Sequence, residues 1–118
     1  MTQQKFFLKK DELPQRFLYP EEFERIVNQN LIDLTPWHIL SGELLKSKYE
    51  GLKQRYPNSS LVPFAQRQDN DDVACWKEED PEKVFIVHDY ASEGWEKRRT
   101  FSSFWDWFKS VVDDMSEF

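Results

Sequence analysis

Acidic side chains that could bind a cation or transfer protons gather in the second half of the chain. Asp69, Asp71 and Asp72 follow one another closely, and His88 stands next to Asp89 further along. Carboxylates are good ligands for hard cations, and Asp-x-Asp spacing occurs in calcium-binding loops. The run lacks the glycine and the distal glutamate of an EF-hand loop, so a solvated turn is the better interpretation. We therefore expect no bound metal and no other cofactor.

A His-Asp pair at the end of a strand could also serve a catalytic triad, in which a carboxylate orients an imidazole. Adjacent residues of a strand point to opposite faces, however, so His88 and Asp89 would not converge. The single cysteine, Cys75, lies in an apolar strand pattern, which favours a buried inert thiol. His38 is typical of a partly buried structural histidine. We predict a protein without enzymatic activity. The weaker alternative is a metal-dependent hydrolase that uses Asp69, Asp71, Asp72 and His88.

Negative charge is concentrated between Asp69 and Glu93. Nine acidic residues stand there against two lysines, a formal charge of −7 in a chain whose net charge is −6. Aromatic side chains among carboxylates suit a protein interface, because aromatic anchors supply binding energy and charge steers the encounter. Trp76 and Trp95 could equally do no more than cover the edge of a sheet. We predict a face for a basic protein partner, made of Asp69, Asp71, Asp72, Trp76, Glu78, Glu79, Asp89, Tyr90 and Trp95.

The composition limits the class of protein. A length of 118 residues suits one domain, and an aromatic content of 16% predicts a core rich in Phe and Trp. No stretch approaches the roughly 18 apolar residues of a membrane-spanning helix, and the N-terminus lacks the apolar run of a signal peptide. The acidic net charge disfavours nucleic acid as a partner. Three basic residues at 97–99 are expected to be solvated or to pair with nearby carboxylates. We expect a cytoplasmic protein.

Hydrophobic spacing predicts three helices, at 20–29, 42–56 and 103–115. Ser103 and Asp106 form the sequence pattern of a capping box at the start of the third helix. The aromatic stripe of that helix is predicted to lie in the core. Residues 1–19 have two apolar patches without clear periodicity, so we predict an arm that packs on the core.

Three short apolar runs separated by acidic turns predict an antiparallel meander of strands, at 61–65, 73–76 and 84–88. Pro63 removes a backbone donor from the first strand, which indicates a sheet edge or a bulge. Residues 35–41 fit either the start of a helix at Thr35-Pro36 or an extended segment. The order of elements is that of an α+β fold, in which we expect the helices to cover one face of the antiparallel sheet.

Several strings of this sequence resemble the SUKH superfamily, the Smi/Knr-type proteins, and in particular one bacterial branch. They extend over about residues 31–112 and comprise TPWHIL, LKQRYPNSSLVPF, LVPFAQRQDNDDVACW, VFIVHDYASEGWE and FSSFWDWF. The DNDD and HDYAS strings are distinctive for this branch. The resemblance implies a single α+β domain over 1–118 and no catalytic residues. Many bacterial members look like immunity proteins, which neutralise a polymorphic toxin, frequently a nuclease, by direct binding. Fungal relatives are scaffolds in cell-wall signalling.

These observations predict a non-enzymatic, cytosolic protein-binding domain that neutralises a basic toxin through its acidic face. A nuclease toxin is basic where it holds phosphate, so an acidic protein could imitate its substrate and bind it rapidly. The alternative is a regulatory or scaffold module that binds another cytosolic protein and has no toxin partner.

Overall fold

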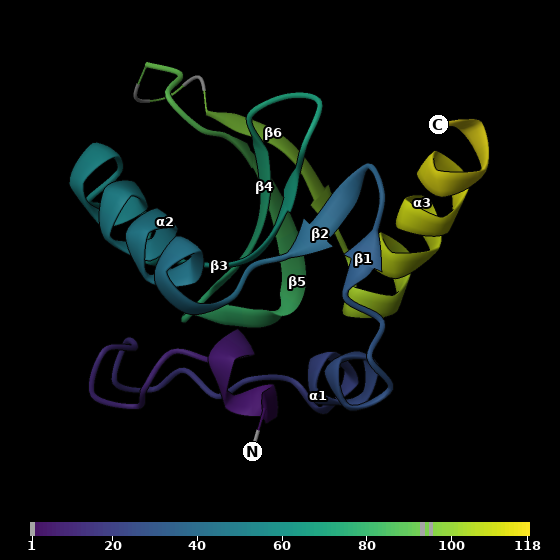
Figure 1. Ribbon diagram of the computed structural model, residues 1–118. Coiled ribbons are helices and arrows are strands. Elements are labelled where there is room, and N and C mark those ends of the chain that lie inside the picture. Colours follow the sequence, from purple (N-terminus) through teal and green to yellow (C-terminus); the bar gives the residue numbers. More distant parts are fainter. Residues whose placement is uncertain (1, 93, 95) are drawn as a thin grey trace.

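The computed structural model describes residues 2–92, 94 and 96–118 (Figure 1). Its six strands form one antiparallel sheet, in which each strand pairs with the next along the chain. The strands are β1 (Asp33–Leu34), β2 (Trp37–Ile39), β3 (Leu61–Arg67), β4 (Asp72–Lys77), β5 (Asp80–His88) and β6 (Lys97–Phe101); the helices are a short 3-10 helix (Thr2–Phe6), α1 (Glu21–Asn28), α2 (Gly42–Arg55) and α3 (Phe104–Glu117). The predicted α+β class and antiparallel meander are confirmed. None of the described helices is long and apolar enough to cross a membrane.

Both faces of the sheet are covered, and α2 and α3 lie on opposite sides of it (Figure 1). Trp76 of β4 belongs to a large aromatic cluster that includes Trp107 of α3. Its neighbour Cys75 packs in a separate cluster with Leu52 of α2 and with Tyr56, which follows that helix. Adjacent strand residues point in opposite directions, so these two helices cover different faces. The expectation that the helices share one face is therefore wrong, because Leu52 of α2 packs on the face that carries Cys75, whereas Trp107 of α3 packs on the opposite face.

The N-terminal arm packs on the aromatic cluster, as predicted. Its buried side chains are Phe6, Leu8 and Phe17. The ring centroid of Phe17 lies 5.7 Å from that of Trp76, and the Tyr49 hydroxyl of α2 donates to the carbonyl of Glu12 at 2.8 Å. The arm is therefore fastened to both the sheet and α2, and it closes one end of the core (Figure 1).

The sheet is wider than the three strands predicted from the sequence. Strands β1 and β2 form a hairpin around Thr35-Pro36, so the extended alternative for 35–41 is correct. On the other side, β6 pairs with β5 although its first four residues are exposed. Pro63 stands next to a register shift between β3 and β4, so its missing donor is explained by a bulge within the sheet.

Helix α3 begins at the predicted cap. The amide of Asp106 donates to Ser103 Oγ at 3.1 Å, which satisfies one of the free amides of the first helical turn. The carboxylate of Asp106 accepts a hydrogen bond from Ser102. From this cap, the buried side chains of Phe104, Trp107 and Val111 run along the face that meets the sheet, so the aromatic stripe belongs to the core.

Candidate functional site

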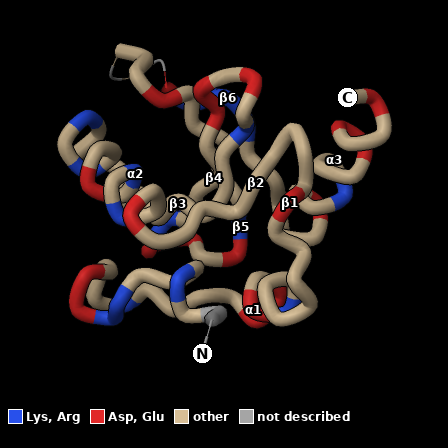
Figure 2. Tube along the Cα trace, viewed as in Figure 1, with Lys and Arg blue, Asp and Glu red and all other residues tan. Residues whose placement is uncertain are grey.

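The antiparallel meander divides the acidic residues from Asp69 to Asp89 between the two ends of the sheet (Figure 2). At one end, the amide of Asp89 donates to the carbonyl of Asp71 at 3.0 Å, so the turn between β3 and β4 adjoins the end of β5. The turn at Glu78-Glu79 joins β4 to β5 at the other end. Strand β4 separates these turns by roughly 20 Å of extended chain. The acidic residues therefore do not form the single face that was predicted.

The residues Glu78 and Glu79 lie away from the other predicted partner-binding residues. The carboxylate of Glu78 accepts from the amide of Arg16 at 2.7 Å, which ties the N-terminal arm to this turn. The side chain of Glu79 is exposed. The first of these glutamates thus has a structural role, and the second can serve as a control for charge at the opposite end of the sheet.

The prediction that Trp76 contacts a partner is wrong, because its side chain is 0% exposed. Its ring stacks on Phe64 with centroids 4.0 Å apart. Glu78 and Glu79, which follow Trp76 closely in sequence, belong to the turn, whereas the indole points into the aromatic cluster. Trp95, the other predicted tryptophan, lies outside the described residues.

Asp89 is also buried, so the prediction that it contacts a partner is wrong. Its carboxylate accepts from Lys48 Nζ at 2.7 Å and from Arg55 through Nε at 2.8 Å and Nη2 at 2.7 Å. Burial alone would raise the pKa of Asp89, but the hydrogen bonds from Arg55 and Lys48 outweigh it and hold the pKa below its usual value. The three side chains fasten the end of β5 to α2.

Tyr90 packs against the ion-paired cluster of Asp89, Lys48 and Arg55. Its φ of 70° is in the left-handed region, which residues other than glycine rarely adopt. The carboxylate of Asp89 accepts from the Tyr90 amide at 2.9 Å, and the guanidinium of Arg55 lies 4.2 Å from the centroid of the tyrosine ring. The ring nevertheless remains 64% exposed. An aromatic side chain is therefore held in a fixed place on the surface.

Gly51 makes room for the guanidinium beneath this ring. A Cβ at position 51 would lie 2.6 Å from Nη2 of Arg55, so any larger residue would displace the guanidinium or be displaced by it. The sequence analysis did not identify Lys48, Gly51 and Arg55, because the charged residues of α2 resemble those of any solvent-exposed helix surface. The available signal was their spacing, since residues three, four and seven apart share one side of a helix.

A hollow of about 530 Å³ lies beside Tyr90 and is also lined by Leu44, Lys48, Gln54 and Gln66. Leu44 is 66% exposed. Two exposed apolar side chains at a polar hollow resemble the small apolar centre and polar rim of many protein interfaces. We call this surface, together with the carboxylates of Asp69, Asp71 and Asp72 in the turn that lies at the same end of the sheet, the Tyr90 face.

The carboxylates of the Tyr90 face differ in their partners. Asp69 binds Arg67 through two hydrogen bonds of 2.8 and 2.9 Å, and the bonds from Arg67 lower the pKa of Asp69. Asp72 Oδ1 lies 3.0 Å from His88 Nδ1. Asp71 is exposed and forms no ion pair with any residue that the structure describes. Asp71 therefore carries a carboxylate without an ion-pair partner among the described residues, and its backbone meets that of Asp89, the neighbour of Tyr90.

The residues considered for metal binding or catalysis lie apart. The carboxylate of Asp69 binds Arg67, whereas that of Asp72 lies beside His88. Within the described residues, no group of three or more possible ligands is placed to hold a metal ion. Cys75 is buried, as predicted, and its burial raises the pKa of the thiol. His38 is half-buried, and burial lowers its pKa.

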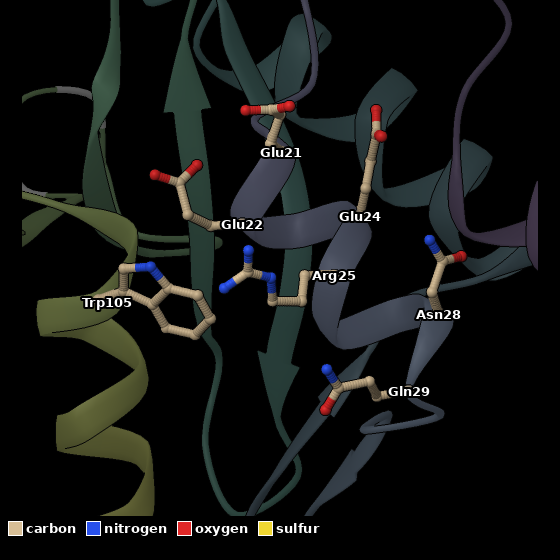
Figure 3. A pocket seen from close by; sticks show the side chains of 7 residues that line it. All are labelled: Glu21, Glu22, Glu24, Arg25, Asn28, Gln29 and Trp105. Atoms are coloured by element: carbon tan, nitrogen blue, oxygen red, sulfur yellow. The ribbon is translucent and has the colours of Figure 1, made fainter.

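A second hollow lies between α1 and α3 (Figure 3). It is lined by Glu21, Glu22, Glu24, Arg25, Asn28, Gln29 and Trp105. The glutamates occupy the first turn of α1, where the helix dipole favours negative charge. Figure 3 shows the side chain of Arg25 extended toward Trp105, with Glu22 nearby. The helix dipole accounts for the acidic residues, and this hollow adds no further chemistry.

No family model, curated protein or solved structure matches this chain in the three comparisons with known proteins. Function therefore rests on the geometry of the Tyr90 face. Among the predicted partner-binding residues, the structure brings Asp69, Asp71, Asp72 and Tyr90 to one end of the sheet and adds Leu44 to them.

Proposed function

We propose that this protein binds a basic protein partner through the Tyr90 face and neutralises it, as an immunity protein blocks a polymorphic toxin. The observation that carries the proposal is the exposed ring of Tyr90, held over Arg55 by a left-handed backbone. Backbone strain of this kind persists only where the surrounding contacts determine it, and it concentrates at functional sites. A ring fixed in this way loses little entropy on binding and suits an interface anchor.

Charge and sequence resemblance add support. A nuclease toxin is basic where it holds phosphate, so the carboxylates around Asp71 would be attracted to that surface and would compete with its substrate. The DNDD and HDYAS strings, which resemble the SUKH superfamily, supply the carboxylates and the tyrosine of the Tyr90 face. The partner expected from this resemblance is a toxin domain encoded beside the gene for this protein, and binding would take place in the cytoplasm.

The substitution Y90G should weaken binding of such a toxin domain by about 30-fold or more, the effect of losing an aromatic hot spot. Glycine adopts the left-handed backbone without strain, so this variant removes the ring and keeps the local conformation. Isothermal titration calorimetry with a catalytically inactive toxin domain measures the change. The variant L18A removes another exposed apolar side chain, away from this face, and should bind normally. Full affinity of Y90G would exclude the ring from the interface.

Charge reversal at the two ends of the sheet locates the acidic part of the interface. D71K should lower the association rate constant about tenfold at low salt, and the loss should shrink at high salt, because steering by exposed charge is screened. E79K makes the same change of charge at the opposite end and should leave the rate nearly unchanged. Stopped-flow binding at two salt concentrations separates these outcomes. Equal effects of both variants would mean that net charge, and not the Tyr90 face, controls the encounter.

A further inference from the structure

Strand β6 forms one edge of the sheet, and among the described residues it pairs only with β5. An edge strand carries a row of amide and carbonyl groups that can pair with a strand from another molecule. The first four of its five residues are exposed. The pairing with β5 shifts register between Lys97 and Arg99, so this edge offers a short, locally bulged backbone template to which a short extended peptide could add.

The edge is basic in a chain whose net charge is −6. Lys97, Arg98 and Arg99 are consecutive and exposed, and none forms an ion pair with another described residue. Within the described residues, the exposure of these three side chains agrees with the expectation that they are solvated. The guanidinium of Arg99 lies over the ring of Phe101, with 4.4 Å between carbon and centroid. Exposed charge on an edge opposes aggregation with like strands, and it also selects a ligand of opposite charge.

A groove of about 250 Å³ continues this basic surface onto the face of the sheet. Apolar side chains of Leu61, Phe85 and Val87 line it together with three basic residues, Lys77, Lys97 and Arg99, and one buried acidic residue, Glu96. Phe85 is half-buried, and Lys77 Nζ lies 4.5 Å from the centroid of its ring. The side chains of an extended peptide point alternately to two sides, so a strand paired with β6 could send alternate side chains toward this groove.

We propose that the β6 edge is a second binding site, and that its ligand is an acidic extended peptide segment that pairs with β6 as an added strand. The carboxylates of the ligand would point away from the groove and meet Arg98, and its alternate apolar side chains would meet Phe85 in the groove, beside Lys97 and Arg99. A single-stranded nucleic acid offers the same charge but no backbone amides for the edge, and the acidic remainder of the chain repels it. The site is opposite in charge to the Tyr90 face and does not depend on it.

A fluorescein-labelled nonapeptide that alternates glutamate with valine tests the proposal by fluorescence anisotropy with the full chain. Binding is expected, and the variant R98E/R99E should weaken it by more than tenfold, since each reversed charge turns an attraction into a repulsion. Y90G should bind the peptide normally, so this outcome is independent of the outcome with the toxin domain. Amide chemical shifts of the variant, recorded by NMR, show whether its fold is retained.

Two N-methylated forms of the same peptide test strand pairing. Methyl groups on one set of alternate amides would remove the donors to β6, whereas methyl groups on the other set would leave those donors free. One isomer should therefore bind like the parent peptide and the other should lose more than tenfold in affinity. Equal binding of both isomers, no binding of the parent peptide, or tighter binding of a single-stranded oligonucleotide would each overturn the proposal.

Discussion

Replacement of Trp76 by alanine is expected to lower the free energy of unfolding by about 4 kcal/mol, a large part of the stability of a domain of this size. The side chain is 0% exposed and stacks on Phe64. The ring centroids of Phe23 and Tyr19 lie 5.1 and 5.6 Å from its own. These neighbours come from different elements, so they cannot collapse together into the space that the indole leaves. Urea unfolding followed by circular dichroism measures the loss.

The variant W76F separates the volume of the ring from its polar group. Nε1 of Trp76 is buried and finds no acceptor among the described residues. A buried donor without an acceptor costs roughly 1–3 kcal/mol, and phenylalanine removes that donor while it keeps most ring contacts. W76F should therefore lose less than about 2 kcal/mol. A folded W76A variant that kept its stability but lost affinity for the partner would contradict the role of Trp76 in the core.

The helices and the inner strands could be predicted because their signals are local. Apolar spacing marks the buried side of each helix, and Ser103 with Asp106 marks the start of α3. Strand β6 could not be predicted in this way. Its sequence KRRTF has no alternation of apolar and polar residues, and its strand conformation depends on pairing with β5. A strand whose side chains are mostly exposed needs no alternation of apolar and polar residues, so its sequence carries almost no signal of a strand.

The candidate site was predicted in part, and its errors have a common physical cause. The distribution of charged residues along the sequence does not give their distribution on the surface, because each tight turn reverses the direction of the chain. For this reason Asp71 and Glu79, close in sequence, lie at opposite ends of the sheet. The burial of Asp89 depends on Lys48 and Arg55, which precede it by a long stretch of chain. No local pattern around Asp89 could show that two cations from α2 would enclose it.

The substitution D89N is expected to lower the free energy of unfolding by about 3 kcal/mol at neutral pH and to weaken partner binding as well. It leaves Lys48 and Arg55, whose side chains are 11% and 30% exposed, without their anionic partner. Removing one member of a buried ion pair costs roughly 3–5 kcal/mol, and the exposure of Arg55 favours the lower value. The single acceptor oxygen that remains in D89N cannot serve the Tyr90 amide, Lys48 and Arg55 together, so the guanidinium beneath the Tyr90 ring loses its fixed position.

The pH dependence of this loss tests the ion pairing itself. Hydrogen bonds from Arg55 and Lys48 lower the pKa of Asp89 in the folded protein, so its stabilisation is complete above the unfolded pKa of about 3.9 and disappears as the pH falls through the folded pKa. The difference in unfolding free energy between the natural chain and D89N should be constant from about pH 6 to 8 and should shrink below about pH 4. Urea titrations across this range measure it, and D71N, which changes an exposed carboxylate, should differ from the natural chain by less than about 0.5 kcal/mol at neutral pH. A difference for D89N that persisted undiminished to pH 2 would show that the loss comes from packing, because a protonated Asp89 could no longer attract the two cations.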